Sequence, residues 1–438
     1  MMKVLSLAWK YHPSITSGVG VACEGLNNAL SKIVELTVIY PAVSSVQIEE
    51  EVVLSSEDLS EDQWKQIETE YIELVEGGVI ELAVRLDPYF VSKQRKYINK
   101  YSATSEKNET LSEKSVKEIK IKKVTEKLLF EEVDVFGESV KDKIFLYNRL
   151  VEELADNIHF DVIHAHDWMT FLAGIALKNK YQKPLVLHVH SLEYDRVGHK
   201  DASWVYDIER FAMSRADKVI SASNYTKGII ESNYGLSQNH IETIYNAITL
   251  PDSLNENGEK NGDLFRVLFA GRIDGNKGIE YFIDIAGKVL KKSKNVEFIV
   301  VGRGIGNVIF EEIDGFDELK NNFRYMGFVE REALFELYSS SDVLCMPSIS
   351  EPFGLTAIEA AFMDLPVVLS RKTGASEILN RTLRADFWDT SKFASHILSI
   401  KENPKLKTRI ISNNREDIAN LSWDKSAKKV LEIFKRLV

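Results

Sequence analysis

The sequence predicts an α/β protein made of two Rossmann-like domains, each built on a parallel β-sheet. Short apolar runs rich in β-branched residues alternate with helical stretches, and this alternation occurs in two successive series. A polar segment rich in Asn, Gly, Asp and Glu separates the two series. Strands that are apolar at nearly every position indicate sheets covered by helices on both faces.

We place the first domain at residues 1–250, the linker at 251–263 and the second domain at 264–420. The amphipathic segment 421–438 is predicted to be a final helix. In the first domain, a helix is expected at 21–32 and strands at 4–9, 34–40, 160–166, 184–190, 217–223 and 241–248. In the second domain, strands are expected at 264–271, 296–302, 323–328, 342–348 and 366–370.

Residues 44–130 interrupt the first series with many charged side chains. One interpretation is an insertion of solvated helices and loops. The other is a surface that docks a polymer, a protein partner or anionic lipid. Glu residues are interleaved with the Lys residues of 106–123, which favours the first interpretation.

Composition excludes several functional classes. The net charge of -11 argues against a general nucleic-acid binder, which needs a basic face, although a local phosphate site remains compatible with it. The only two cysteines, Cys23 and Cys345, lie in apolar surroundings, so we expect no disulfide framework and a cytoplasmic location. The apolar run at the N-terminus is too short for a secretory signal. No apolar run reaches the length of a transmembrane helix, so none is expected.

Candidate ligand-binding residues follow the predicted strands, where open α/β sheets bind their ligands. After the first strand, residues 13–20 include Gly18 and Gly20 and lead into a helix. Glycines allow a ligand to approach the backbone closely, and a helix N-terminus offers free N–H groups to an anion. Taken alone the loop is weak evidence, and an ordinary strand-to-helix turn is the favoured interpretation.

The segment His164-Ala165-His166-Asp167-Trp168 ends another strand. Side chains alternate along a strand, so His164 and His166 share one face. A neutral imidazole can bond a sugar hydroxyl, and Trp168 can pack against a sugar or in the core. Structural histidines, or a zinc site that also uses His188 and His190, are the competing interpretations.

The loop at 271–278 carries Arg272 and Lys277 among glycines, directly after the first strand of the second domain. Fixed positive charge next to open backbone amides is what a diphosphate requires. A solvated basic turn is the alternative.

The most informative segment is 348–360, which follows a strand and contains Glu351 and, eight residues later, Glu359. We expect Pro352 to occupy the first turn of a helix and Gly354 to allow a close approach. A carboxylate can accept two hydrogen bonds from a sugar diol. Both glutamates are therefore predicted to face one cleft.

With these motifs, the chain resembles the retaining glycosyltransferases of the GT-B fold, in the group that includes family four and the glycogen synthases. The resemblance covers nearly the whole chain. It rests on Gly18-Val19-Gly20, HAHDW (164–168), Arg272 with Lys277, and the motif that begins at Glu351. Residues 188–196 and 205–227 are similar to the glycogen-synthase-like branch. Ser17 stands where glycogen synthases commonly have Lys, so backbone amides would make that phosphate contact.

The resemblance implies roles for these residues. Arg272 and Lys277 would hold the donor diphosphate, and Glu359 would bind the ribose. Glu351 would face the transferred sugar, and His166 would bond one of its hydroxyls.

The resemblance also implies that the backbone amides of Phe353, Gly354 and Leu355 contact sugar and phosphate, and that the domains close on the donor. The final helix would cross back to the first domain.

The implied reaction is the transfer of glucose, with retention, from UDP- or ADP-glucose to a carbohydrate acceptor. No Asp-x-Asp motif occurs, so no metal and no cofactor are predicted. Another sugar donor, or a lipid, protein or small-molecule acceptor, remains open. A nucleotide-sugar epimerase and a non-catalytic binding subunit are further alternatives, and the oligomeric state is not determined.

Overall fold

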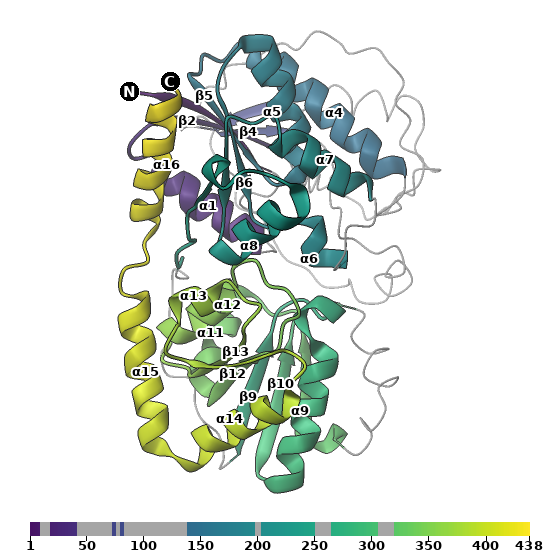
Figure 1. Cartoon of the computed structure of the whole chain (residues 1–438), viewed down its shortest axis with the longest axis vertical. Helices are drawn as coiled ribbons and strands as arrows, with labels where there is room; N and C mark the ends of the chain where they lie inside the picture. Colours follow the sequence, from purple (N-terminus) through teal and green to yellow (C-terminus); the bar gives the residue numbers. More distant parts are fainter. Residues whose placement is uncertain are drawn as a thin grey trace, which may run out of the picture. The chain divides into compact units, whose positions relative to one another are not determined.

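The computed structural model of the chain describes residues 1–8, 18–41, 72–75, 79–82, 138–197, 203–249, 264–304 and 319–438 (Figure 1). It contains two sheets flanked by helices, which confirms the predicted α/β class. The first sheet has the order β3-β4-β2-β1-β5-β6-β7-β8, and the second has the order β11-β10-β9-β12-β13-β14. Every pairing in the second sheet is parallel. In the first sheet, β3 and β4 pair antiparallel.

Most predicted strands are present with small changes at their ends, but the strand expected at 241–248 covers only Ile241–Thr243. Three observed strands, Ile72–Val75, Val79–Leu82 and Leu383–Ala385, were not predicted. The strands of the first sheet are β1 (Lys3–Leu7), β2 (Glu35–Pro41), β3 (Ile72–Val75), β4 (Val79–Leu82), β5 (Val162–His166), β6 (Leu185–Val189), β7 (Lys218–Ser221) and β8 (Ile241–Thr243). Those of the second are β9 (Phe265–Ala270), β10 (Val296–Val301), β11 (Phe323–Gly327), β12 (Val343–Met346), β13 (Val367–Ser370) and β14 (Leu383–Ala385).

Helices connect most of these strands. Those that precede β9 are α1 (Gly18–Leu30), α4 (Glu138–Ala155), α5 (Trp168–Tyr181), α6 (Glu193–Val197), α7 (Trp204–Met213) and α8 (Asn224–Ile229). Those that follow it are α9 (Ile279–Lys292), α11 (Arg331–Ser340), α12 (Leu355–Phe362), α13 (Ala375–Ile378), α14 (Thr390–Glu402), α15 (Pro404–Ile418) and α16 (Trp423–Leu437).

The chain forms two compact units. The first comprises Met1–Cys23, Ser31–Leu187 and Val438, and the second comprises Glu24–Leu30 and His188–Leu437. The domain boundaries expected from the sequence stay a prediction, because the linker at 251–263 lies outside the described residues. Most of the charged segment 44–130 also lies outside them, and β3 and β4 are its described parts.

Alternation along β9 explains why the second sheet has a core on each face. Val267 and Phe269 pack in a cluster with α9 and α14, whereas Leu268 and Ala270 pack in another cluster with α11 and α12. Figure 1 shows α9 and α14 next to β9 and β10. Each buried aliphatic or aromatic side chain contributes roughly 1.5–3 kcal/mol. The two cores therefore hold the strand ends, and the loops that follow them, in fixed positions.

The segment predicted as the final helix forms α16. Its Ser426 hydroxyl donates to the carbonyl of Tyr245 over 2.7 Å, and its Arg436 pairs with Glu242 on β8 over 2.7 Å. Both contacts lie within the second unit. Among the described helices, none combines the length and hydrophobicity that a membrane span requires.

Candidate active site

The loop after β9 carries both predicted diphosphate-binding cations. Asp274 accepts a hydrogen bond from the backbone N–H of Lys277 over 2.9 Å and so caps the single 3₁₀ turn Gly275–Lys277. The Arg272 guanidinium lies 3.3 Å from the Asp274 carboxylate, and its side chain is 50% exposed. A local cap therefore fixes the loop, while Arg272 extends into solvent.

Two predicted loops meet at Gly278. This residue has a φ of +76°, and a Cβ atom built there would lie 2.1 Å from the carbonyl oxygen of Pro347. Only glycine fits such an approach without displacing backbone. Beside it, the N–H of Ile349 donates to the carbonyl of Asn276 over 2.8 Å. The loop after β12 is thus held directly against the loop after β9.

Lys277 and Glu351 form an ion pair across this contact. The two side chains are 20% and 11% exposed, so the pair is largely withdrawn from solvent. The backbone of Glu351 is held as well, because its N–H donates to Lys372 and its carbonyl accepts from Gly374, each over 2.9 Å. Two of the residues predicted from separate motifs are therefore brought together.

One local expectation is wrong. Pro352 does not occupy the first turn of a helix, because α12 begins three residues later, at Leu355. Gly354 occupies the capping position with a φ of +95°, outside the range that a helix uses. The Pro352 carbonyl is instead bonded by the hydroxyls of Ser223 and Thr226, the former over 2.5 Å. These bonds hold Pro352 in the loop.

The backbone amides at the start of α12 match what a bound anion needs. Within the described ranges, the N–H groups of Phe353, Gly354 and Leu355 donate no hydrogen bond. The first amides of a helix point outward and carry partial positive charge. The Phe353 side chain is buried and lies near Tyr245, with ring centroids 6.4 Å apart. The side chain anchors this turn, and the amides remain available to a ligand.

Glu359 has different partners from Glu351. It lies within α12, is 3% exposed, and accepts hydrogen bonds from Arg331 over 2.7 Å and from the Tyr338 hydroxyl over 3.2 Å. Burial raises the pKa of Glu359, and Arg331 opposes this rise. Sequence reasoning missed Arg331 and Tyr338. Their spacing of seven residues, which places both on one face of α11, was the available signal.

Sequence reasoning also missed the contacts that α6 makes with these loops. Asp195 accepts from the Ser350 hydroxyl over 2.6 Å, next to Glu351 in the sequence. The carbonyl of Arg196 accepts from the Asn276 side chain over 2.7 Å, next to Lys277. The Arg196 guanidinium is fixed in turn by Glu193 at 2.6 Å and by Glu209 at 3.2 Å.

The remaining predicted residues lie in the first unit. Gly18 and Gly20 lie in the first turn of α1, while residues 13–17 of their loop are outside the described part of the chain. His166 ends β5 and is buried, and its ring lies 4.2 Å from that of His164, as alternation predicts. Trp168 is 6% exposed and begins α5, which favours the packing interpretation for its ring.

Buried histidines are among the described side chains that could act as metal ligands. In the second unit, the rings of His188 and His190 stack with centroids 4.4 Å apart. Burial lowers the pKa of His190 to about 3, so its imidazole is neutral near pH 7. Neutral imidazole is the form that binds metals. The expected absence of a metal therefore stays a prediction.

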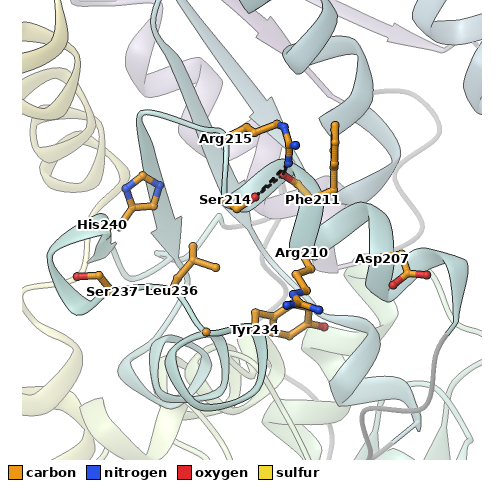
Figure 2. Close-up of a pocket in the computed structure, with 10 residues that line it drawn as sticks. Asp207, Arg210, Phe211, Ser214, Arg215, Tyr234, Leu236, Ser237 and His240 are labelled. Carbon is orange, nitrogen blue, oxygen red and sulfur yellow. Dashed lines mark hydrogen bonds between the residues drawn. The ribbon is translucent and has the colours of Figure 1, made fainter.

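A separate pocket of the second unit lies between α7 and residues 234–240 (Figure 2). Its lining includes Arg210, Phe211 and His240, and the Arg215 guanidinium covers the Phe211 ring at 3.8 Å. None of the predicted catalytic or donor-binding residues lines it.

Comparisons with known proteins agree with this arrangement. Residues 129–250 match the model of Glycosyltransferase Family 4, and residues 252–417 match that of Glycosyl transferases group 1. The chain is 29% identical over 295 residues to an uncharacterized glycosyltransferase of Methanocaldococcus jannaschii, MJ1607, covering 63% of this chain and 75% of that protein.

Solved structures show the same fold at low identity. Sucrose-phosphate synthase from Thermosynechococcus elongatus aligns with a TM-score of 0.70 at 15% identity, over 100% of this chain and 99% of that chain. The catalytic domain of starch synthase IV from Arabidopsis thaliana, bound to ADP and acarbose, aligns with a TM-score of 0.67 at 15% identity, over 99% of both chains. Together, these matches and the two-sheet architecture establish that the chain belongs to the family-four glycosyltransferases of the GT-B fold.

Proposed function

We propose that the chain transfers glucose, with retention of configuration, from UDP- or ADP-glucose to a carbohydrate acceptor. The observation that carries this proposal is the Lys277–Glu351 ion pair, which brings a diphosphate-type cation to the carboxylate assigned to the transferred sugar. The presence of ADP and a carbohydrate in the starch synthase IV structure supports the same substrate classes.

On this proposal, Arg272 and Lys277 stabilise the negative charge that develops on the departing diphosphate. The free amides of Phe353, Gly354 and Leu355 add hydrogen bonds to phosphate and sugar. Glu359 accepts hydrogen bonds from the ribose. The resemblance alone assigns a sugar hydroxyl to His166 and a backbone phosphate contact to the Gly18–Gly20 turn.

Bond making and breaking follow from these roles. The acceptor hydroxyl attacks the anomeric carbon on the face from which the diphosphate leaves. The acceptor proton passes to the departing phosphate oxygen, so no separate base is required. Glu351 opposes the positive charge that develops on the sugar ring. Because Arg272 and Lys277 supply the charge for the diphosphate, no metal is required.

A panel of UDP-, ADP- and GDP-sugars tests the proposal, with nucleotide release followed in the presence and absence of glycogen or maltooligosaccharide. We expect release that depends on acceptor, that persists in EDTA, and that gives an α-linked product by NMR. A β-linked product would contradict retention, and loss of activity in EDTA would contradict metal independence. Interconversion of sugars without release would indicate an epimerase, and no reaction with any donor would favour a binding subunit. Release only with lipid, protein or small-molecule acceptors would reject the carbohydrate polymer.

A further inference from the structure

Arg331 contacts two distant parts of the second unit at once. Its Nη2 atom donates to the Glu359 carboxylate over 2.7 Å and also to the backbone carbonyl of Thr249. Glu359 belongs to α12, whereas Thr249 lies six residues beyond the end of β8 at Thr243. Arg331 therefore bridges the carboxylate assigned to the ribose and the segment through which the chain leaves the first sheet.

The Thr249 end of this bridge is itself fixed. The Thr249 hydroxyl accepts a hydrogen bond from the indole N–H of Trp423 over 2.9 Å. Trp423 begins α16, which contacts β8 further along through Arg436 and Glu242. The outgoing chain and the final helix thus meet at Thr249. The carbonyl that Arg331 contacts therefore belongs to a residue that α16 also holds in place.

We propose that Arg331 is a positioning residue that orients the Glu359 carboxylate for the two ribose hydroxyls of the donor. This inference rests on the proposed function, because it takes Glu359 as the ribose-binding group. Arg331 touches neither the sugar nor the phosphates on this assignment. Replacing Arg331 should therefore lower the affinity for the nucleotide and leave the contacts to the diphosphate unchanged.

The hydrogen-bonding capacity of Glu359 supports this division of roles. A carboxylate offers about four acceptor positions on its two oxygens. Arg331 occupies one on Oε1 and Tyr338 one on Oε2, which fixes the plane of the group. Counting only partners in the described part of the chain, one position is left on each oxygen, which matches a diol whose two hydroxyls each donate one hydrogen bond.

The charge of Arg331 is as important as its geometry. Glu359 is buried, and burial favours the protonated form, which has fewer acceptor positions. Arg331 and Tyr338 are the described ionisable groups that act on Glu359, and only Arg331 carries a charge that opposes its protonation. The neutral Tyr338 hydroxyl alone would leave a buried, unpaired carboxylate, which is costly.

The test compares Arg331→Met with wild type in binding UDP, ADP and inorganic pyrophosphate by calorimetry. Pyrophosphate has no ribose, so it measures the diphosphate contacts alone. We expect the Kd for the preferred nucleoside diphosphate to rise about ten- to a hundredfold, as for the loss of a hydrogen bond that involves a charged group. We expect the Kd for pyrophosphate to stay within about twofold of wild type, and the KM for the donor to rise more than kcat falls.

Arg409→Met is the matched control, because Arg409 is exposed on α15. Arg331→Lys keeps the charge but lacks the planar guanidinium, and should lie between wild type and Arg331→Met. Acidification should weaken nucleotide binding as Glu359 is protonated. Loss of the opposing charge should move this transition to higher pH in Arg331→Met and less in Arg331→Lys.

The outcomes separate this inference from the proposed function. If wild type binds none of the nucleoside diphosphates, the proposed function is wrong. If wild type binds them and Arg331→Met binds equally well, only the positioning role is wrong. Equal losses for pyrophosphate and nucleotide would also reject the positioning role, because they indicate a general disturbance. Should Arg331→Met not fold, the Arg331→Lys comparison decides by the same criteria.

Discussion

Lys277 and Glu351, which lie 74 residues apart in the sequence, form an ion pair between the loop after β9 and the loop after β12. Under the proposed function, Lys277 would bind the donor diphosphate and Glu351 would face the transferred sugar. The ion pair thus places the group proposed for the diphosphate in contact with the group proposed for the sugar. A donor that binds as proposed would have to share or replace this contact.

Replacement of Lys277 by Ala should lower turnover by about 100-fold or more, the size expected when one stabilising donor of a transition-state anion is removed. Lys291→Ala, at the exposed end of α9, is the control and should leave turnover unchanged. Initial rates with the preferred donor measure the effect, and thermal unfolding shows whether the fold is kept. An unchanged rate in Lys277→Ala would refute the phosphate role.

The Lys277–Glu351 ion pair should also contribute to the thermal stability of the chain. Lys277→Ala and Glu351→Gln each leave one partner unpaired in a site that is largely withdrawn from solvent. We expect the double variant to lose less in its thermal midpoint than the sum of the single variants. Strict additivity would show that the two side chains do not interact in solution.

Gly278→Ala tests the contact between the two loops. The new Cβ atom would meet the carbonyl of Pro347, and the positive φ would be strained. We expect a destabilisation of roughly 1–3 kcal/mol and a loss of turnover. Gly275→Ala, in the same loop, meets no atom within 4 Å and should stay close to wild type in both measurements. Equal thermal midpoints for the two variants would contradict the close approach of the loops at Gly278.

Glu377 joins α13 to the start of α8. Its carboxylate accepts from the backbone N–H of Asn224 at 3.0 Å and of Tyr225 at 2.6 Å, and from the Tyr245 hydroxyl at 2.9 Å. Glu377→Gln should cost about 1–2 kcal/mol, because it replaces a charged acceptor at a helix N-terminus. Glu336→Gln on the exposed face of α11 is the control. A midpoint equal to that of this control would contradict the capping role.

Both cysteines should be unreactive in the folded chain. Cys23 and Cys345 are fully buried, and burial raises the pKa of each thiol, which disfavours the reactive thiolate. A thiol reagent such as DTNB should label neither residue in native buffer and both after unfolding in denaturant. Rapid labelling of the native chain would show that one of these regions opens readily.

The sequence determined the fold class and predicted the loops that make up the candidate site. A strand buried on both faces needs consecutive apolar residues, so the strands can be recognised locally in the sequence. The two series of strands, and the glycines next to strand ends, are recognised in the same way. For this reason, the loops with Lys277 and Glu351 could be found by inspection. Pro352 was misplaced because the start of α12 depends on bonds from Ser223 and Thr226, more than 100 residues away.

Only the tertiary structure decided which side chains meet. Glu359 was predicted as a carboxylate facing a cleft, but its pairing with Arg331 depends on the packing of α11 against α12. The contacts of Asp195 and Asn276 likewise join elements 155 and 80 residues apart. The periodic spacing of apolar residues shows which face of a helix or strand is buried. Which residues contact that face depends on how the helices and strands pack together.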